Sequence, residues 1–283
     1  MDRPLDVAVV VPTRNSATTL RACLESLRAQ THPCEIIVVD NGSSDETCVI
    51  AKELADHVLT CGPERSAQRN AGAAHTSAPI IGFIDSDMIL SPNVVAEAVL
   101  GVAGGAVTVV IPERTIGEGY WAKVSAFERS FYEDDQFVEA PRFFDAEVFH
   151  RVGGFDEAMT GAEDWDLGQR TASLGTRSRT TAGIVHEEGR VRFFNICMKK
   201  AYYAPGVALF VKKHGIGTMR EMTGRRWLRQ PRALVNSLGV GLVVLKAGQA
   251  LAMVGGLVAD SVGHRAKLPG RPDTAQSHRR VGH

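Results

Sequence analysis

Short apolar runs alternate with amphipathic stretches along the first 111 residues. Continuous β-branched runs without polar positions are typical of strands that are buried on both faces, as in a parallel sheet. The predicted strands are 7–11, 36–39, 58–60, 80–84 and 106–111. The predicted helices between them are 17–30, 46–55, 65–76 and 92–101. This alternation predicts an α/β fold with a doubly wound, mostly parallel sheet and flanking helices.

The alternation weakens after residue 112. We predict helices at 118–132 and 161–174, a turn at 152–157, and a short strand that ends at 184–189. The second helix opens with Glu163, Asp164 and Asp166. Acidic side chains suit the positive end of a helix dipole, so helix capping by itself would explain them.

A long apolar stretch covers residues 234–259. It is long enough to span a bilayer, but Asn236, Lys246 and Gln249 interrupt it. We expect a helix that lies in, or dips into, the membrane interface. A helical hairpin that closes the core or forms a dimer interface is the alternative. The predicted regions are an α/β domain at 1–190, a basic and apolar helical region at 191–263, and a disordered tail at 264–283.

The charges are divided unevenly, although the net charge is zero. Residues 1–189 carry 15 Lys/Arg and 29 Asp/Glu, whereas residues 190–283 carry 17 and 3. A basic C-terminal region favours contact with an anionic surface, and we expect a membrane surface and no nucleic acid. The basic and aromatic residues ahead of the apolar stretch are Tyr202, Tyr203, Lys212, Lys213, Arg220, Arg225, Arg226, Trp227, Arg229 and Arg232.

The cysteines and the N-terminus indicate the compartment. Five cysteines, with no CxxC pair, favour free thiols in a reducing compartment. The charged start at 1–6 is followed by an apolar run of only five residues, which does not predict a signal peptide. We therefore expect a cytoplasmic protein that is peripheral on the inner face of the cell membrane.

Two acids, Asp85 and Asp87, follow the strand 80–84. Alternate residues of a strand face the same side, so we expect both carboxylates to converge on one point. Charged groups there are costly unless they are paired or bound to a cation. The pair is therefore either a metal site that holds a phosphate or a solvated acidic turn. Polar residues also end the first two strands, where ligands of such sheets bind, and this favours the metal site.

Six motifs occur in an order and spacing that resemble the family 2 glycosyltransferases, which have a GT-A fold. They are Val9-Val10-Val11-Pro12-Thr13-Arg14-Asn15, Val38-Val39-Asp40-Asn41-Gly42-Ser43-Ser44-Asp45, Arg65-Ser66-Ala67-Gln68-Arg69-Asn70-Ala71-Gly72, Asp85-Ser86-Asp87, Gly153-Gly154-Phe155-Asp156 and Glu163-Asp164-Trp165-Asp166-Leu167. The resemblance covers about residues 5–190.

The resemblance implies a nucleotide site. The residues that it assigns to the base are Pro12, Thr13, Asn15 and Asp40. Those that it assigns to the base and ribose are Arg65, Gln68 and Arg69, with the ribose also contacted by Asp85. A carboxylate at Asp40 can accept a hydrogen bond from a uracil N–H. The alternatives are a turn-forming role for Asp40 and a surface ion pair for Arg69.

The resemblance also implies the metal and the base. Asp87 would bind Mg²⁺ or Mn²⁺, and His186 would add a metal or diphosphate contact, unless it is an ordinary core or surface histidine. Asp164, paired with Glu163, would remove the proton of the acceptor hydroxyl in one inverting displacement. Trp165 would stack on a sugar or pack in the core.

The resulting prediction is an inverting, metal-dependent glycosyltransferase that uses a nucleotide sugar, expected to be a UDP-sugar. The acceptor is not predicted, although the basic tail makes a lipid-linked acceptor plausible, and neither is the oligomeric state. A catalytically silent nucleotide-sugar-binding or scaffold protein is one alternative. A sugar-1-phosphate nucleotidyltransferase is another, but it needs a glycine-rich loop after the first strand, and residues 12–16 contain no glycine.

Overall fold

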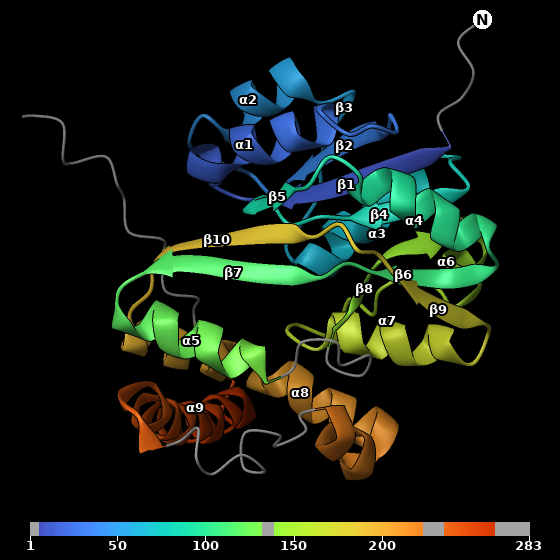
Figure 1. Cartoon of the computed structure of the whole chain (residues 1–283). Helices are drawn as coiled ribbons and strands as arrows, with labels where there is room; N and C mark the ends of the chain where they lie inside the picture. The colour runs from blue at the N-terminus through green and yellow to red at the C-terminus, as the bar shows by residue number, and fades with distance from the viewer. Residues whose placement is uncertain (1–5, 132–138, 223–234, 264–283) are drawn as a thin grey trace, which may run out of the picture.

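A seven-stranded sheet with the order β3-β2-β1-β4-β8-β6-β9 forms the centre of the structure (Figure 1). The computed structural model describes residues 6–131, 139–222 and 235–263. The strands are β1 (Val7–Thr13), β2 (Glu35–Asp40), β3 (His57–Thr60), β4 (Ile80–Phe83), β6 (Ala106–Val110), β8 (Pro141–Asp145) and β9 (Thr176–Arg179). β1 pairs in parallel with β2 and β4, β2 with β3, and β6 with β9. The predicted doubly wound, mostly parallel α/β sheet is confirmed.

Some helices of the described residues cover the two faces of this sheet, and others lie in a separate layer (Figure 1). The helices are α1 (Ala17–Arg28), α2 (Thr47–Leu54), α3 (Arg65–His75), α4 (Val94–Ala103), α5 (Tyr120–Ser130), α6 (Ala146–Arg151), α7 (Glu163–Ala172), α8 (Phe193–Met222) and α9 (Ser237–Ser261). Successive side chains of β1 point to opposite faces. Val9 therefore joins a core with Leu24 of α1, and Val10 joins a second core with Ala73 of α3 and Phe149 of α6.

The strand β8 lies between β4 and β6 and is antiparallel to both. The sequence pattern does not predict it, because Pro141 and Arg142 interrupt its apolar run. Pro141 is tolerated as the first residue of the strand. Phe143 lies against Gly82 of β4, where an added Cβ would come within 2.5 Å of the phenyl ring. Gly82 therefore makes room for the ring that β8 inserts into the core.

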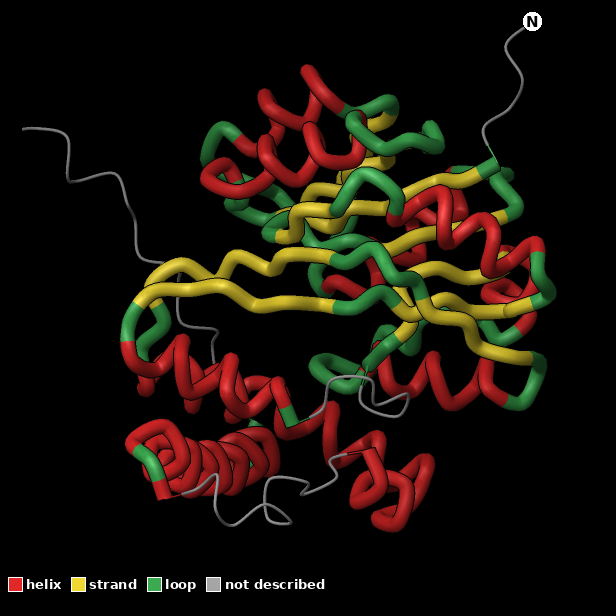
Figure 2. Tube along the Cα trace, viewed as in Figure 1, coloured by secondary structure: helices red, strands yellow, loops and turns green. Residues whose placement is uncertain are grey.

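A second sheet of three strands has the order β5-β10-β7. The strands are β5 (Met88–Leu90), β7 (Glu113–Glu118) and β10 (Ile184–Arg190), as the tube in Figure 2 shows. β10 is antiparallel to β5 and parallel to β7. Only β10 is predicted from the sequence. Since β4 ends at Phe83 and β5 begins at Met88, residues 84–87 join the two sheets.

Helices α5, α8 and α9 form a layer on one side of the molecule (Figure 1). Val124 of α5 packs against Leu242 and Leu245 of α9. The chain breaks from helical geometry within α8 at Gly215, where φ is 87°. α9 is the one helix of the described residues that is long and apolar enough to cross a membrane, with a mean hydropathy of 1.8. The predicted tail at 264–283 and the arginine-rich segment 223–234 lie outside the described residues.

Part of the predicted membrane approach instead faces the α/β domain. The hydroxyl of Tyr202 donates to Glu64 at 2.8 Å, and the ammonium of Lys213 lies 2.8 Å from Asp166. Both partners, Glu64 and Asp166, lie on the sheet side of α8. Tyr202 and Lys213 thus contact the α/β domain, and the membrane contact expected for this basic and aromatic segment stays a prediction.

Helix α3 packs closely on β1 at Gly72, where an added Cβ would lie 2.4 Å from Val10 Cγ1. We expect Gly72→Ala to lower the free energy of unfolding by about 1–3 kcal/mol, because the extra methyl overpacks the core. Chemical denaturation measures this. The matched control is Gly255→Ala on α9, where a Cβ meets nothing within 4 Å and alanine favours the helix. Equal effects of the two substitutions would contradict the close contact.

Candidate active site

Asp40 lies at the carboxyl end of β2, beside the end of β1. The Thr13 hydroxyl donates to Asp40 Oδ1 at 3.0 Å, and the Ser43 N–H donates to Oδ2 at 2.8 Å. Burial raises the pKa of Asp40, but hydrogen bonds from Ser43 and Thr13 outweigh it, so the net pKa is lowered. Asp40 therefore both shapes the turn and remains an ionised hydrogen-bond acceptor at this edge.

The other residues predicted for the nucleotide site differ in their burial and in their hydrogen bonds. The Gln68 amide nitrogen donates to the carbonyls of Thr13 and Val39, at 2.9 and 2.6 Å. Gln68 thus ties α3 to the ends of two strands. Asn15 is exposed at a positive φ of 49°, and its Oδ1 accepts the Ser44 N–H at 2.9 Å. Pro12 is buried within β1.

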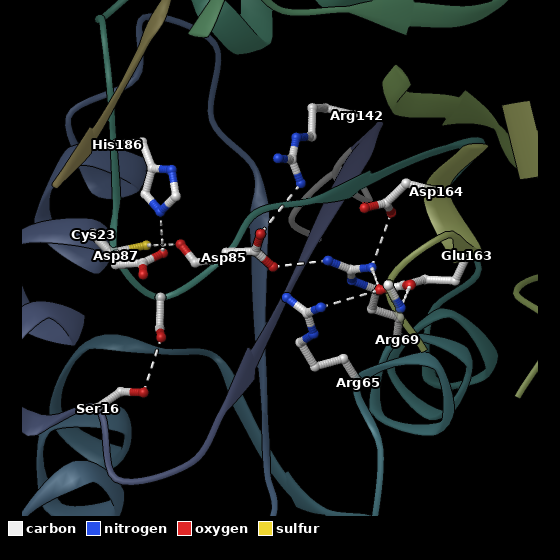
Figure 3. Close-up of polar contacts among 12 residues, drawn as sticks. Ser16, Cys23, Arg65, Arg69, Asp85, Asp87, Arg142, Glu163, Asp164 and His186 are labelled. Atoms are coloured by element: carbon white, nitrogen blue, oxygen red, sulfur yellow. Dashed lines mark hydrogen bonds and ion pairs between the residues drawn. The ribbon is translucent and has the colours of Figure 1, made fainter. Parts of the chain in front are cut away.

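Asp85 and Asp87 point in different directions (Figure 3). The Met88 N–H donates to the Asp85 carbonyl at 3.0 Å, so residues 85–88 form a turn. The alternation of a strand does not apply in a turn. The prediction that both carboxylates converge on one point is therefore wrong, and each acid belongs to its own cluster of side chains.

Arg69 connects the first of these clusters, and its side chain is fully buried. Its Nη2 donates to Asp85 Oδ1 at 2.8 Å, and its Nη1 donates to Asp164 Oδ1 at 3.0 Å (Figure 3). The same Nη1 lies 3.6 Å from Glu163 Oε1. One guanidinium therefore holds the acid that follows β4 and the two acids that open α7. The alternative of a surface ion pair for Arg69 is excluded.

Arg142 of β8 is the second cation on Asp85, with Nη1 3.4 Å from Oδ2. It also donates through Nε to Glu113 of β7 at 2.7 Å. Burial raises the pKa of Asp85, but the charges of Arg69, Arg142 and Arg65 outweigh it and hold that pKa well below its usual range. Sequence reasoning missed Arg142. The available signal was a charged residue next to the apolar Phe143 and Phe144.

The three acids of α7 have distinct environments. Glu163 is 3% exposed, and its carboxylate accepts from the Gly161 N–H and from Arg65. Asp166 is fully buried and lies 2.7 Å from His214 of α8, with Lys213 and Arg170 also bound. Asp164 is 32% exposed and binds Arg69 through Oδ1. Of the three, Asp164 is the acid that solvent or a substrate reaches most readily.

Asp87 forms the second cluster with His186 of β10, whose Nε2 lies 3.3 Å from Asp87 Oδ1. Among the described residues, no group of three or more histidine, cysteine or acidic side chains could hold a metal. A carboxylate and an imidazole nevertheless suit Mg²⁺ or Mn²⁺, since such ions often take one or two protein ligands and complete their shell with substrate phosphates and water.

A cavity of about 230 Å³ lies beside Asp164 and runs along α7. Trp165 lines it, and the same ring packs 6.2 Å from that of Phe210. Trp165 therefore packs against α8 and forms part of the cavity wall, and the predicted stacking on a sugar stays a prediction. Gly168 of α7 and Arg177 of β9 also line the cavity. Asp164, the most exposed of the three α7 acids, therefore borders a cavity.

The model of the family "Glycosyl transferase family 2" matches residues 8–156, which is more than half of the chain. The chain belongs to glycosyltransferase family 2. It is 30% identical over 237 residues to the pre-mycofactocin glycosyltransferase of Mycobacterium tuberculosis, covering 74% of this chain and 48% of that protein. It is 27% identical over 242 residues to the validoxylamine A glucosyltransferase of Streptomyces hygroscopicus subsp. jinggangensis, covering 67% and 57%. The chain thus spans about half the length of the curated relatives it matches.

Solved structures show the fold of this family 2 glycosyltransferase. The mannosyltransferase PcManGT from Pyrobaculum calidifontis, in complex with GDP-Man and Mn²⁺, superposes with a TM-score of 0.59 at 19% identity, covering 91% of this chain and 79% of that chain. S. aureus TarS 1–349 in complex with UDP-GlcNAc gives 0.56 at 15% identity, covering 93% of each. The predicted family and GT-A fold are confirmed. The roles predicted for individual site residues remain predictions.

Removal of Arg69 tests its structural role. We expect Arg69→Met to lower the free energy of unfolding by about 3–5 kcal/mol, because it leaves Asp85 and Glu163 without their shared cation. Chemical denaturation at neutral pH is the measurement. Arg151→Met is the matched control, since the Arg151–Glu147 pair is exposed and such pairs contribute about 1 kcal/mol or less. A loss at Arg69 no larger than the control would overturn the role.

The lowered pKa of Asp85 predicts a pH dependence. Its ionised form stabilises the fold fully above the unfolded-state pKa of about 4, and this contribution is lost as the pH falls toward the folded-state pKa. We expect the difference in unfolding free energy between wild type and Asp85→Asn to be largest near about pH 7 and to shrink below about pH 4. Denaturation at several pH values measures it. Glu147→Gln, at a side chain 79% exposed, should show little difference at either pH.

Proposed function

We propose that this protein transfers a sugar from a nucleotide sugar, with a UDP-sugar as the favoured donor, to an acceptor hydroxyl with inversion at the anomeric carbon. One observation carries the proposal. Asp164 is partly exposed at the start of α7, and Arg69 links it directly to Asp85. A carboxylate available to a substrate is thereby held at a set position relative to the strand ends where ligands of α/β sheets bind.

In the proposed reaction, Asp164 accepts the proton of the acceptor hydroxyl as that oxygen attacks the anomeric carbon. A bond forms between the acceptor oxygen and the anomeric carbon. The bond from that carbon to the diphosphate oxygen breaks, and its electron pair leaves with the nucleoside diphosphate. A single in-line displacement inverts the configuration. Because Arg69 binds Asp164 through Oδ1 and the side chain is partly exposed, the carboxylate can turn Oδ2 toward the acceptor.

The nucleotide is proposed to lie along the ends of β1, β2 and β4. Asp40 and Thr13 lie together there, with the exposed Asn15 close by through Ser43. The buried Pro12 and Gln68 would support this edge from within. Arg65 would meet the ribose or diphosphate from the start of α3, because its side chain is 39% exposed. Asp85, already held by Arg69, would contact the ribose.

Asp87 and His186 are the proposed ligands of Mg²⁺ or Mn²⁺. Their 3.3 Å separation and the chemistry of the oxygen and imidazole donors support this assignment. When bound, the ion would supply neutralisation of charge on the departing diphosphate. Asp87 lies in the turn just before β5, and His186 lies on β10. The antiparallel pairing of β5 with β10 brings the two residues together.

We further propose that the acceptor is lipid-linked and that the protein is cytoplasmic and peripheral on the inner face of the membrane. The charge of residues 190–283, with 17 Lys/Arg and 3 Asp/Glu, supports contact with anionic lipid. The cavity beside Asp164 offers space for the hydroxyl-bearing end of such an acceptor.

The proposed base is tested by Asp164→Asn. We expect kcat for sugar transfer to fall by about 10²–10⁴-fold with little change in donor KM, because the amide cannot accept the proton. A product assay with a panel of nucleotide sugars and acceptors, run with Mg²⁺ or Mn²⁺, measures this. Glu147→Gln on α6 is the control acid and should keep full activity. Undiminished transfer by Asp164→Asn would rule out Asp164 as the base.

The proposed metal ligands have a separate test that does not need an acceptor. We expect UDP with Mn²⁺ to raise the Tm of the wild type, because a ligand that binds the native state stabilises it. Asp87→Ala should lose the Mn²⁺-dependent part of the shift, and chelation by EDTA should remove it from the wild type. An Mn²⁺-dependent shift that survives in Asp87→Ala would place the ion elsewhere.

A further inference from the structure

The two polar residues in the middle of helix α9, Lys246 and Gln249, lie toward the protein. Lys246 pairs with Glu128 of α5, and it also contacts Gln249, which is buried. Asn236 caps the helix, because its Oδ1 accepts the Gly239 N–H at 2.8 Å. The three polar residues that interrupt the apolar sequence are therefore satisfied on the inner side or at the helix start, and none of them divides the outer face.

The outer face of α9 is apolar along nearly its whole length. Its exposed residues recur at spacings of three, four and seven, which places them on one side of a helix. We call this set the outer stripe; it consists of Val240, Val243, Val244, Leu251, Val254, Leu257 and Val258. Leu251 is 76% exposed and Val254 is 61% exposed. Within 240–258, all of which the structure describes, every exposed residue is apolar or glycine.

An ordinary surface helix buries its apolar side and exposes a polar side, whereas α9 exposes an apolar side. A contiguous exposed apolar face of this kind marks an interaction surface. From Val240 to Val258 the stripe extends over roughly 27 Å of helix. The surface needs a partner that is long, apolar and continuous.

The inner face keeps α9 attached along the protein. An added Cβ at Gly241 would lie 2.3 Å from the Tyr120 hydroxyl, and one at Gly256 would lie 2.1 Å from the Ala201 carbonyl. These close approaches are to α5 at one end and to α8 at the other. If α9 left its packing against α5 and α8 to span a bilayer, it would lose both contacts. It would also carry Lys246 into hydrocarbon, which is costly.

We propose that the outer stripe of α9 docks the protein on an anionic lipid bilayer, with the helix lying in the plane of the interface. A helix with one apolar face and basic surroundings inserts that face into the boundary between headgroups and acyl chains. The proposal rests on the membrane location proposed above and names the surface that makes the contact, and it does not depend on the identity of the donor or the acceptor.

Charge favours a bilayer over a second copy of the chain. Four arginines and no acidic residue occupy the sequence 223–234, directly before α9. Lys199 and Lys200 are exposed on α8, the helix against which α9 packs. In a two-fold dimer each patch meets its own copy, so these positive charges would be brought together. Anionic headgroups would instead neutralise them.

Co-sedimentation of the full chain with lipid vesicles tests the proposal. We expect wild type to bind vesicles of phosphatidylcholine with phosphatidylglycerol, to bind pure phosphatidylcholine more weakly, and to lose part of the difference at high salt. The double variant Leu251→Gln, Val254→Gln should lower the vesicle partition coefficient by about tenfold or more. Its Tm should match that of the wild type, because both side chains already lie in solvent.

The matched control is Val49→Gln, Leu100→Gln, at residues 67% and 71% exposed on α2 and α4, which should bind vesicles as wild type does. Asp164→Asn should also bind normally, so a failure of docking and a failure of the proposed chemistry are distinguishable. The proposal is overturned if wild type ignores both vesicles or if the α9 double variant binds like the control. It is equally overturned if light scattering shows a dimer that the α9 variant splits and vesicles do not bind.

Discussion

A fully buried guanidinium is the constraint on which the site depends. A charge in the protein interior is costly unless anionic partners surround it, and Arg69 meets that condition with Asp85, Asp164 and Glu163. Its planar fork imposes the directions in which those acids lie. The Phe155 ring lies under the guanidinium, with its centroid 5.0 Å from Cζ, and excludes water from that side. Helix α3 therefore sets where α7 begins relative to the end of β4.

Sequence reasoning predicts those elements whose burial is visible in the local pattern of apolar residues. Strands β1, β2 and β4 are buried on both faces, and their uninterrupted apolar runs predict this burial from the sequence. β8 escapes prediction because its burial is created by strands that are distant in sequence. The same limit applies within the site. Asp164 and Asp85 are recognisable from their motifs, but Arg142 owes its importance to an acid 57 residues away.

In the C-terminal region, the sequence does not show which side chains face the protein and which face outward. In the sequence, Lys246 and Gln249 weaken the case for an apolar surface. Their spacing does not show whether the two side chains face the protein or the outside. Glu128, which lies 118 residues from Lys246 in the sequence, decides it by drawing the ammonium inward. Conversely, Tyr203 looks like part of an interfacial belt, yet its hydroxyl lies 3.2 Å from Arg65. Helix α8 is thereby shared between the lipid-facing layer proposed for α9 and the start of α3.

The antiparallel strand β8 has a consequence for how the chain reaches its native pairing. Phe143 opposes Gly82 in the native register, and Arg142 precedes it next to the acid that follows β4. A slip of one residue turns every side chain of a strand to the other face. A slipped β8 would press a wrong side chain on Gly82 and would remove the second cation from Asp85. Misalignment is thus penalised once by volume at Gly82 and once by charge at Asp85, so both positions help to fix the register of β8.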